Sequence, residues 1–249
     1  MPHVAARLLA FPLILLGVAL MRMSALALAA GFVVAVPAAA GDAAKYTIKQ
    51  ASSSAPKEVS EPIRKLLSDN SIQFMGGDGN SICEIWLRKE LPVKATPEQI
   101  KNGLTYREVE ESTVVGAVRF DREWTDYRKQ KVKPGIYTLR LGFQPMDGDH
   151  MGTAPYPDFC LVVPANVDQK PDLMEAKELR EVSAKSNGGS HPTVLLLFPN
   201  EKPEGAAQLV DKGDNTWVLM IREPVSVDGK SAGAGMGFGL TLIGQTSAP

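Results

Sequence analysis

The sequence predicts a mainly β fold, an antiparallel β-sandwich of the immunoglobulin-like or jelly-roll-like kind with one or two short helices. Short apolar segments of strand length follow one another along the chain, and Gly and Pro residues separate them. These segments do not alternate regularly with helical patterns, as they would in a doubly wound parallel sheet. No internal repeat and no linker divides the chain beyond its N-terminal segment. We therefore expect a single β domain at residues 41–249.

Residues 1–40 have the pattern of an export signal. They contain no Asp or Glu, carry Arg7 and Arg22, and end in three alanines before Gly41. Two apolar runs flank Arg22, and a start at Met21 would give a signal of more ordinary length. Each run is shorter than the 20 or so apolar residues of a membrane span, so an uncleaved anchor is the less favoured alternative. We expect cleavage after Ala40 and a periplasmic or extracellular protein, attached to a membrane only if the segment is uncleaved.

Charge argues against a nucleic-acid partner. Without residues 1–40 the chain has 209 residues, 25 basic and 28 acidic, and a net charge of −3. Its one basic cluster, residues 128–133, leads into the turn-forming pair Pro134-Gly135. Nucleic-acid binding needs a concentrated basic face. The sequence gives no indication of a cofactor.

Ten segments predict strands. Each is short, mostly apolar, and bounded by turn-forming residues. They cover residues 45–50, 72–75, 82–91, 114–120, 136–143, 159–163, 193–198, 208–210, 216–221 and 234–243. The alternation is clearest in 136–143, where Tyr137, Leu139 and Leu141 share one face while Thr138 and Arg140 share the other.

Two segments predict helices. Residues 60–67 begin with Ser60 as a cap and have Pro62 in the first turn. Residues 172–187 form a helical insert, because apolar residues recur there at helical spacing and Asp172 and Glu175 have the spacing of a capping box. Glycines at 188 and 189 end it.

The segment 233–239 has glycine at every second position. In a strand this spacing leaves one face bare while Met236, Phe238 and Leu240 point to the other. A bare face allows another backbone to approach closely. We expect the three apolar residues in the core and a backbone packed against the glycines.

Two cysteines, Cys83 and Cys160, follow the export segment, and both lie in strand-like stretches. An oxidising compartment would permit a disulfide between them. Two buried free thiols are the alternative, because a buried cysteine behaves as a small apolar residue. The sequence leaves both open.

Two clusters are candidate sites. Asp147, Asp149 and His150 could supply oxygen and imidazole ligands to a metal, although Asp-Gly pairs are also common in ordinary turns. Trp124 and Tyr127 lie among charged residues, a mixture typical of sugar-binding surfaces. No nucleophile–base motif and only two histidines follow residue 40.

Two segments carry a resemblance to known proteins: residues 131–141, which include a Pro-Gly-x-Tyr-x-Leu pattern, and residues 83–92, from Cys83 to Pro92. Together they resemble a family of uncharacterised exported bacterial proteins of planctomycete type, a domain of unknown function. The resemblance implies a β-sandwich fold and supplies no activity or catalytic residue. The favoured hypothesis is a non-catalytic exported protein that binds a protein or a cell-envelope component. The alternatives are a metal-binding protein or metal-assisted hydrolase using 147–150, and a carbohydrate-binding module.

Overall fold

Strands dominate the structure, a computed structural model that describes residues 45–148, 150, 152–201 and 205–246. The export segment predicted at 1–40 lies outside these residues. The strands are β1 (Tyr46–Ser52), β2 (Asn70–Gly76), β3 (Ser81–Leu87), β4 (Leu91–Pro92), β5 (Val114–Phe120), β6 (Trp124–Thr125), β7 (Lys131–Val132), β8 (Gly135–Phe143), β9 (Asp158–Pro164), β10 (Val194–Phe198), β11 (Gln208–Asp211), β12 (Trp217–Val227) and β13 (Lys230–Ile243). The helices are α1 (Glu61–Arg64), α2 (Pro97–Asn102), the 3-10 turn η1 (Tyr106–Glu108) and α3 (Ala176–Ala184). Within the described residues, no helix has the length and apolar character needed to cross a membrane.

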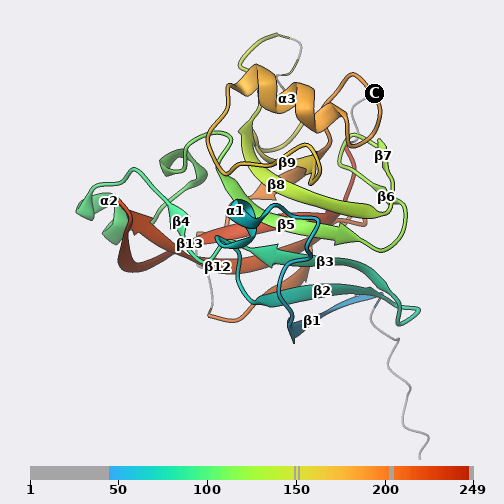
Figure 1. Cartoon of the computed structure of the whole chain (residues 1–249), viewed down its shortest axis with the longest axis horizontal. Helices are drawn as coiled ribbons and strands as arrows, with labels where there is room; N and C mark the ends of the chain where they lie inside the picture. Colours follow the sequence, from blue (N-terminus) through green and yellow to red (C-terminus); the bar gives the residue numbers. More distant parts are fainter. Residues whose placement is uncertain (1–44, 149, 151, 202–204, 247–249) are drawn as a thin grey trace, which may run out of the picture. The chain divides into compact units, whose positions relative to one another are not determined.

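One large sheet contains all the strands except β6 and β7, which pair with each other. Its order is β1-β2-β3-β5-β8-β9-β10-β13-β12-β11, all antiparallel, and β4 adds a short parallel pairing to β12. The sheet curls into a half-barrel. Figure 1 shows β1, β2, β3, β5, β8 and β9 rising in that order through the view, with α3 above them.

The prediction of a mainly β fold is confirmed, but the structure does not divide clearly into the two facing sheets of a sandwich. Strand β10 is the reason. Residues 194–196 pair with β9, and residues 197–198 pair with β13. The two halves of the sheet are therefore joined by backbone hydrogen bonds where a sandwich would have a gap.

Apolar side chains from alternate strand positions fill the concave side. They come from both halves of the sheet and include Ile72, Phe74, Ile85, Leu139, Leu141, Val162, Leu195, Leu197, Leu219, Ile221, Phe238 and Leu240. Because these residues alternate with outward-facing ones, each strand contributes a full stripe to one core.

Two smaller apolar clusters cover parts of the convex side. Ile63 of α1 packs in a cluster with Trp86 and Val114. Leu179 of α3 packs in another with Phe159 and Leu161 of β9. Burial on both faces explains why β3 and β9 are apolar along most of their length.

Both predicted helices form, but each is shorter than expected. In α1, the Leu66 amide bonds to the Ile63 carbonyl three residues back, so the chain leaves the α-helical pattern at once. The insert predicted at 172–187 becomes α3, and Glu175 lies at its N-cap without a capping side-chain bond. Helix α3 starts later than predicted because the backbone before it makes other hydrogen bonds. The carbonyls of Lys170 and Asp172 accept hydrogen bonds from the Arg140 side chain.

The glycine-rich strand is arranged as predicted. Met236, Phe238 and Leu240 are buried in the concave core. On the other face, a Cβ atom built on Gly237 would lie 1.7 Å from the Asn200 carbonyl oxygen, and one on Gly239 would lie 2.6 Å from that of Phe198. The backbone at the end of β10 therefore crosses directly over these glycines.

We expect Gly237→Val to destabilise the protein by about 1–3 kcal/mol, because valine would force the crossing backbone away. The expected result is a lower thermal midpoint than that of the wild type. Gly148→Val is the matched control, since nothing lies within 4 Å of a Cβ atom there. An unchanged midpoint for Gly237→Val would contradict the packing described here.

Candidate functional site

The two ends of the curled sheet meet at one point and separate beyond it. The ring of Tyr46, at the start of β1, lies 5.3 Å from that of Trp217, at the start of β12. Beside them Lys45 donates to the Asn215 side chain over 2.5 Å. We call the line between β1 on one side and β11 and β12 on the other the seam.

Along the seam, β12 has a gap in its pairing. Strand β11 pairs with residues 217–220, and β4 pairs with residues 225 and 226. In the part of the chain described, residues 221–224 therefore have a strand neighbour only in β13. Here the half-barrel is open.

A cavity of about 460 Å³ occupies this opening. Its volume lies within the range of small-ligand sites. Its walls come from β1, β2, β3, the chain that follows β3, and β12. They are formed by Gln50, Ala51, Ser52, Ser68, Asn70, Ser71, Ile72, Ile85, Leu87, Arg88, Lys89, Glu223 and Pro224. We call this cavity the seam cleft.

Glu223 is the carboxylic acid in the wall of the seam cleft. It continues the inward-facing stripe of β12, where its neighbours two residues away are Ile221 and Val225. Glu223 is 6% exposed. Within the described residues no hydrogen bond or ion pair to its carboxyl is found, and its oxygens are not fully enclosed by protein atoms, so they reach the cavity. Burial raises the pKa of Glu223 from its ordinary value of 4.5 to about 8.

The basic residues of the cleft do not neutralise this carboxyl. Arg88 donates to the Val114 carbonyl (3.2 Å), and burial, then the charge of Arg140, lowers the pKa of Arg88. Lys89 is exposed and lies 3.8 Å from the Asp69 carboxylate. Glu223 therefore has a cavity on one side, apolar side chains around it, and no countercharge within bonding distance.

The sequence contained a signal for this site that went unused. Along β12 the inward positions read Leu219, Ile221, Glu223 and Val225, so an acidic residue replaces an apolar one in a regular alternation. The predicted strand ended at residue 221, which left Glu223 outside it.

No family model, curated protein or solved structure matches this chain. The resemblance based on residues 83–92 and 131–141 thus stays an expectation. Function has to be argued from the geometry of the chain itself.

The loop predicted to bind metal contains a local pair instead of an assembled site. His150 Nδ1 lies 2.6 Å from the Asp147 carboxylate, which also accepts from the His150 backbone amide. Asp149 lies outside the described residues. Among those described, no three His, Cys, Asp or Glu residues are grouped as metal ligands would be. The contacts at Asp147 are those of an Asx-type turn.

The predicted sugar platform at Trp124 and Tyr127 is wrong. Trp124 is buried, stacks on Phe120 at 4.7 Å, and donates its indole N–H to the Leu242 carbonyl. Tyr127 is half-buried and packs in the cluster that contains Phe159. Trp124 joins the β6–β7 hairpin to the core, so its ring is not available to a ligand.

Cys83 and Cys160 are buried free thiols in this structure. Strands β5 and β8 lie between β3 and β9, so three strand spacings of about 4.8 Å separate the two residues. A disulfide needs Cα atoms within about 7 Å. Burial raises the pKa of both thiols, which keeps them protonated and unreactive.

A second buried charged group lies on the convex side, on β8. Arg140 and Asp168 are fully buried and share two bonds of 2.8 Å. Thr138 donates to the same carboxylate. The remaining Arg140 donors bind the carbonyls of Ser112, Lys170 and Asp172. Since every partner is internal, this group holds the segment 164–175 against the sheet and leaves nothing for a ligand.

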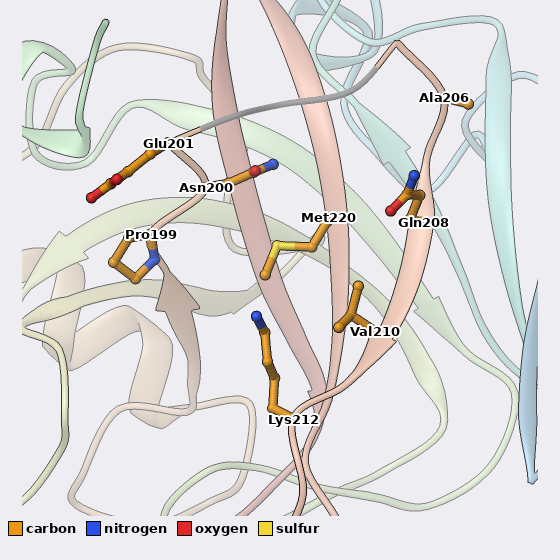
Figure 2. A pocket seen from close by; sticks show the side chains of 8 residues that line it. All are labelled: Pro199, Asn200, Glu201, Ala206, Gln208, Val210, Lys212 and Met220. Atoms are coloured by element: carbon orange, nitrogen blue, oxygen red, sulfur yellow. The ribbon is translucent and has the colours of Figure 1, made fainter.

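A smaller hollow of about 210 Å³ lies beside β11 and β12. In Figure 2 its side chains project from the end of β10 on one side and from two strands on the other, with Lys212 and Met220 between them. Residues 202–204, between the lining residues Glu201 and Ala206, lie outside the described residues, so we do not assign a site there.

Proposed function

We propose that this protein is a ligand-binding protein whose binding site is the seam cleft. One observation carries the proposal: Glu223 is buried at the cavity wall without a partner. Ionisation of a carboxyl in that position is costly unless a countercharge compensates it, so the free group stays largely protonated at neutral pH. A bound ligand would provide that compensation.

The composition of the wall favours binding over catalysis. Nucleophilic catalysis needs a nucleophile beside a base that activates it, and many acid–base mechanisms use a second group as well. The cleft wall contains Glu223 but no second carboxylic acid, histidine or cysteine. It does contain uncharged polar residues on β1 and β2 opposite apolar ones, the combination typical of recognition sites.

The export pattern of residues 1–40 supports placing this binding outside the cytoplasm. A protein or cell-envelope partner, expected from the sequence, would then meet the site directly. The cleft is of the size that suits a small molecule or one side group of such a partner.

A blocking variant tests the proposal. Ser52 lines the cleft, so we expect Ser52→Trp to fill it. The purified protein would be screened by thermal shift against amines, carboxylic acids, monosaccharides and dipeptides. A ligand class that binds should raise the midpoint of the wild type by about 2–4 °C for each kcal/mol of binding stabilisation. Ser52→Trp should abolish that rise.

The matched control is Thr47→Trp. Thr47 is exposed on the same strand, but its odd position places it on the opposite face. This variant should respond to ligand like the wild type. If no class raises the midpoint, or if Ser52→Trp responds as strongly as the wild type, the seam cleft is not the binding site.

A further inference from the structure

We infer that the seam cleft is selective for organic cations, and that it holds an ammonium or guanidinium group against the Glu223 carboxyl. This inference rests on the proposed function and specifies its ligand class. It follows from the positions of the charges around the cleft.

The residues that line the cleft around Glu223, and its partner on β13, include only two charged side chains, while β4, which pairs with β12 at Val225 and Ser226, consists of the uncharged Leu91 and Pro92 and follows the half-buried Glu90. Strands β1 and β2 present the uncharged residues Gln50, Ser52 and Asn70. Strand β13 places Met236 opposite Glu223. The chain after β3 contributes Arg88 and Lys89, whose bonds go to Val114 and towards Asp69.

The inner wall of the cleft therefore lacks a positive charge that could pair with the Glu223 carboxylate. A neutral ligand would leave the carboxyl in its apolar surroundings, and an anionic ligand would meet a like charge once Glu223 ionises. An ammonium or guanidinium group supplies the countercharge and donates hydrogen bonds to both carboxylate oxygens. The hydroxyl and amide groups of Ser52, Gln50 and Asn70 remain for the polar body of the ligand.

Another way to bind a ligand here would be for a peptide to pair its backbone with the open edge of β12, but this edge is poorly suited to strand pairing. Pro224 has no N–H to donate, and its position at the edge blocks a regular ladder. An inward-pointing acidic residue also opposes strand addition. These features leave the side chain of Glu223, and not the strand edge, as the recognition element.

Binding of a cation should be linked to proton release. Burial keeps Glu223 largely protonated at pH 7, since its pKa is about 8. A cation stabilises the ionised form, so binding should release close to one proton from Glu223 to the buffer. Affinity should therefore rise with pH up to about 8 and then level off for a guanidinium ligand, which stays charged throughout.

Two probes of the same shape test the inference: n-butylguanidinium and its neutral analogue n-butylurea. Calorimetry at pH 8 should show n-butylguanidinium binding about 10- to 100-fold more tightly than n-butylurea, as a charge-assisted bond to a buried carboxylate would give. Glu223→Gln, which keeps the shape of the side chain, should remove that preference. Titrations at pH 7 in phosphate and Tris buffers should show the proton release in the wild type and none in Glu223→Gln.

The outcomes separate this inference from the proposed function. If both probes bind equally to the wild type and Ser52→Trp blocks both, the cleft binds ligands but the cation inference is wrong. If hexanoate binds more tightly than n-butylguanidinium, the cleft selects anions through Arg88 and Lys89, and the inference is also wrong. If nothing in the broader ligand panel binds either, the proposed function fails with it.

Discussion

Replacing Arg140 with leucine should destabilise the protein by about 3–5 kcal/mol, because the substitution leaves a buried carboxylate without its partner. Asp168 is 1% exposed as a side chain and receives its two 2.8 Å bonds from Arg140. The substitution also removes the donor from the carbonyls of Ser112, Lys170 and Asp172. Urea denaturation of wild type and variant measures the change directly.

Two further variants make this result specific. Arg122 forms an ion pair with Asp78 at 3.3 Å in which both side chains are about half exposed, so Arg122→Leu should change stability by less than about 1 kcal/mol. The double variant Arg140→Leu/Asp168→Leu should recover part of the loss, because no uncompensated charge remains. If Arg140→Leu is no more destabilising than Arg122→Leu, the buried network is not a determinant of stability.

The buried network of Arg140 and Asp168 could be predicted from the sequence only in part. The alternation in 136–143 correctly separates Leu139 and Leu141 from Thr138 and Arg140, and that pattern suggests a solvated polar face for the second pair. In the structure the segment 164–175 covers that face and brings Asp168 from 28 residues away. Alternation identifies the face of a residue but not whether a later segment will cover it.

The open edge of the sheet marks a second boundary. The sequence pattern predicts that one strand ends at residue 221 and that the next begins at residue 234. In the structure, β12 continues to Val227 and β13 begins at Lys230, joined by the two-residue turn Asp228-Gly229 with positive φ at both residues. Asp-Gly between strands is a strong hairpin signal. Pro224 lies only four residues before this turn, and proline within a segment argues against a central strand.

Strand β12 accommodates Pro224 through two local features. The register shifts between Pro224 and Ser226, and the edge beside residues 221–224 has no strand partner among the described residues. Both were invisible in the sequence, since they depend on where β11 and β4 end. The same error removed Glu223 from the predicted strand and so from the predicted sites.

Local capping signals were only partly reliable. The expected caps at Ser60 and at Asp172 and Glu175 make no capping side-chain bond. The capping box that does form, with both of its bonds, joins Thr96 and Gln99 at the start of α2, where no helix was predicted. Long-range pairing was less accessible. Strand β10 pairs with β9 and with β13, and this double pairing makes one curled sheet instead of two facing sheets. The sequence of residues 194–198 does not indicate that the strand has two different partners.

Glu223 should make the stability of the protein depend on pH by up to about 5 kcal/mol between pH 4.5 and 8. Its pKa rises from 4.5, the ordinary value expected in the unfolded chain, to about 8 in the fold. Over these 3.5 units the folded state binds the extra proton, and each unit corresponds to about 1.4 kcal/mol. The free energy of unfolding should therefore fall as pH rises from 4.5 to 8 and be unaffected by Glu223 outside that range.

The pKa values of other carboxyl groups are raised as well, so the quantity to measure is the difference in stability between wild type and variant. Burial also raises the pKa values of Asp126 and Asp158, and both residues remain in Glu223→Gln. Subtracting the unfolding free energy of Glu223→Gln from that of the wild type isolates Glu223. The difference should become steadily less favourable to the wild type up to pH 8, where the variant is the more stable protein. A difference that does not change between pH 4.5 and 8 would show that the pKa of Glu223 is not raised in the fold, and it would remove the buried, unpartnered carboxyl on which ligand binding at the seam cleft depends.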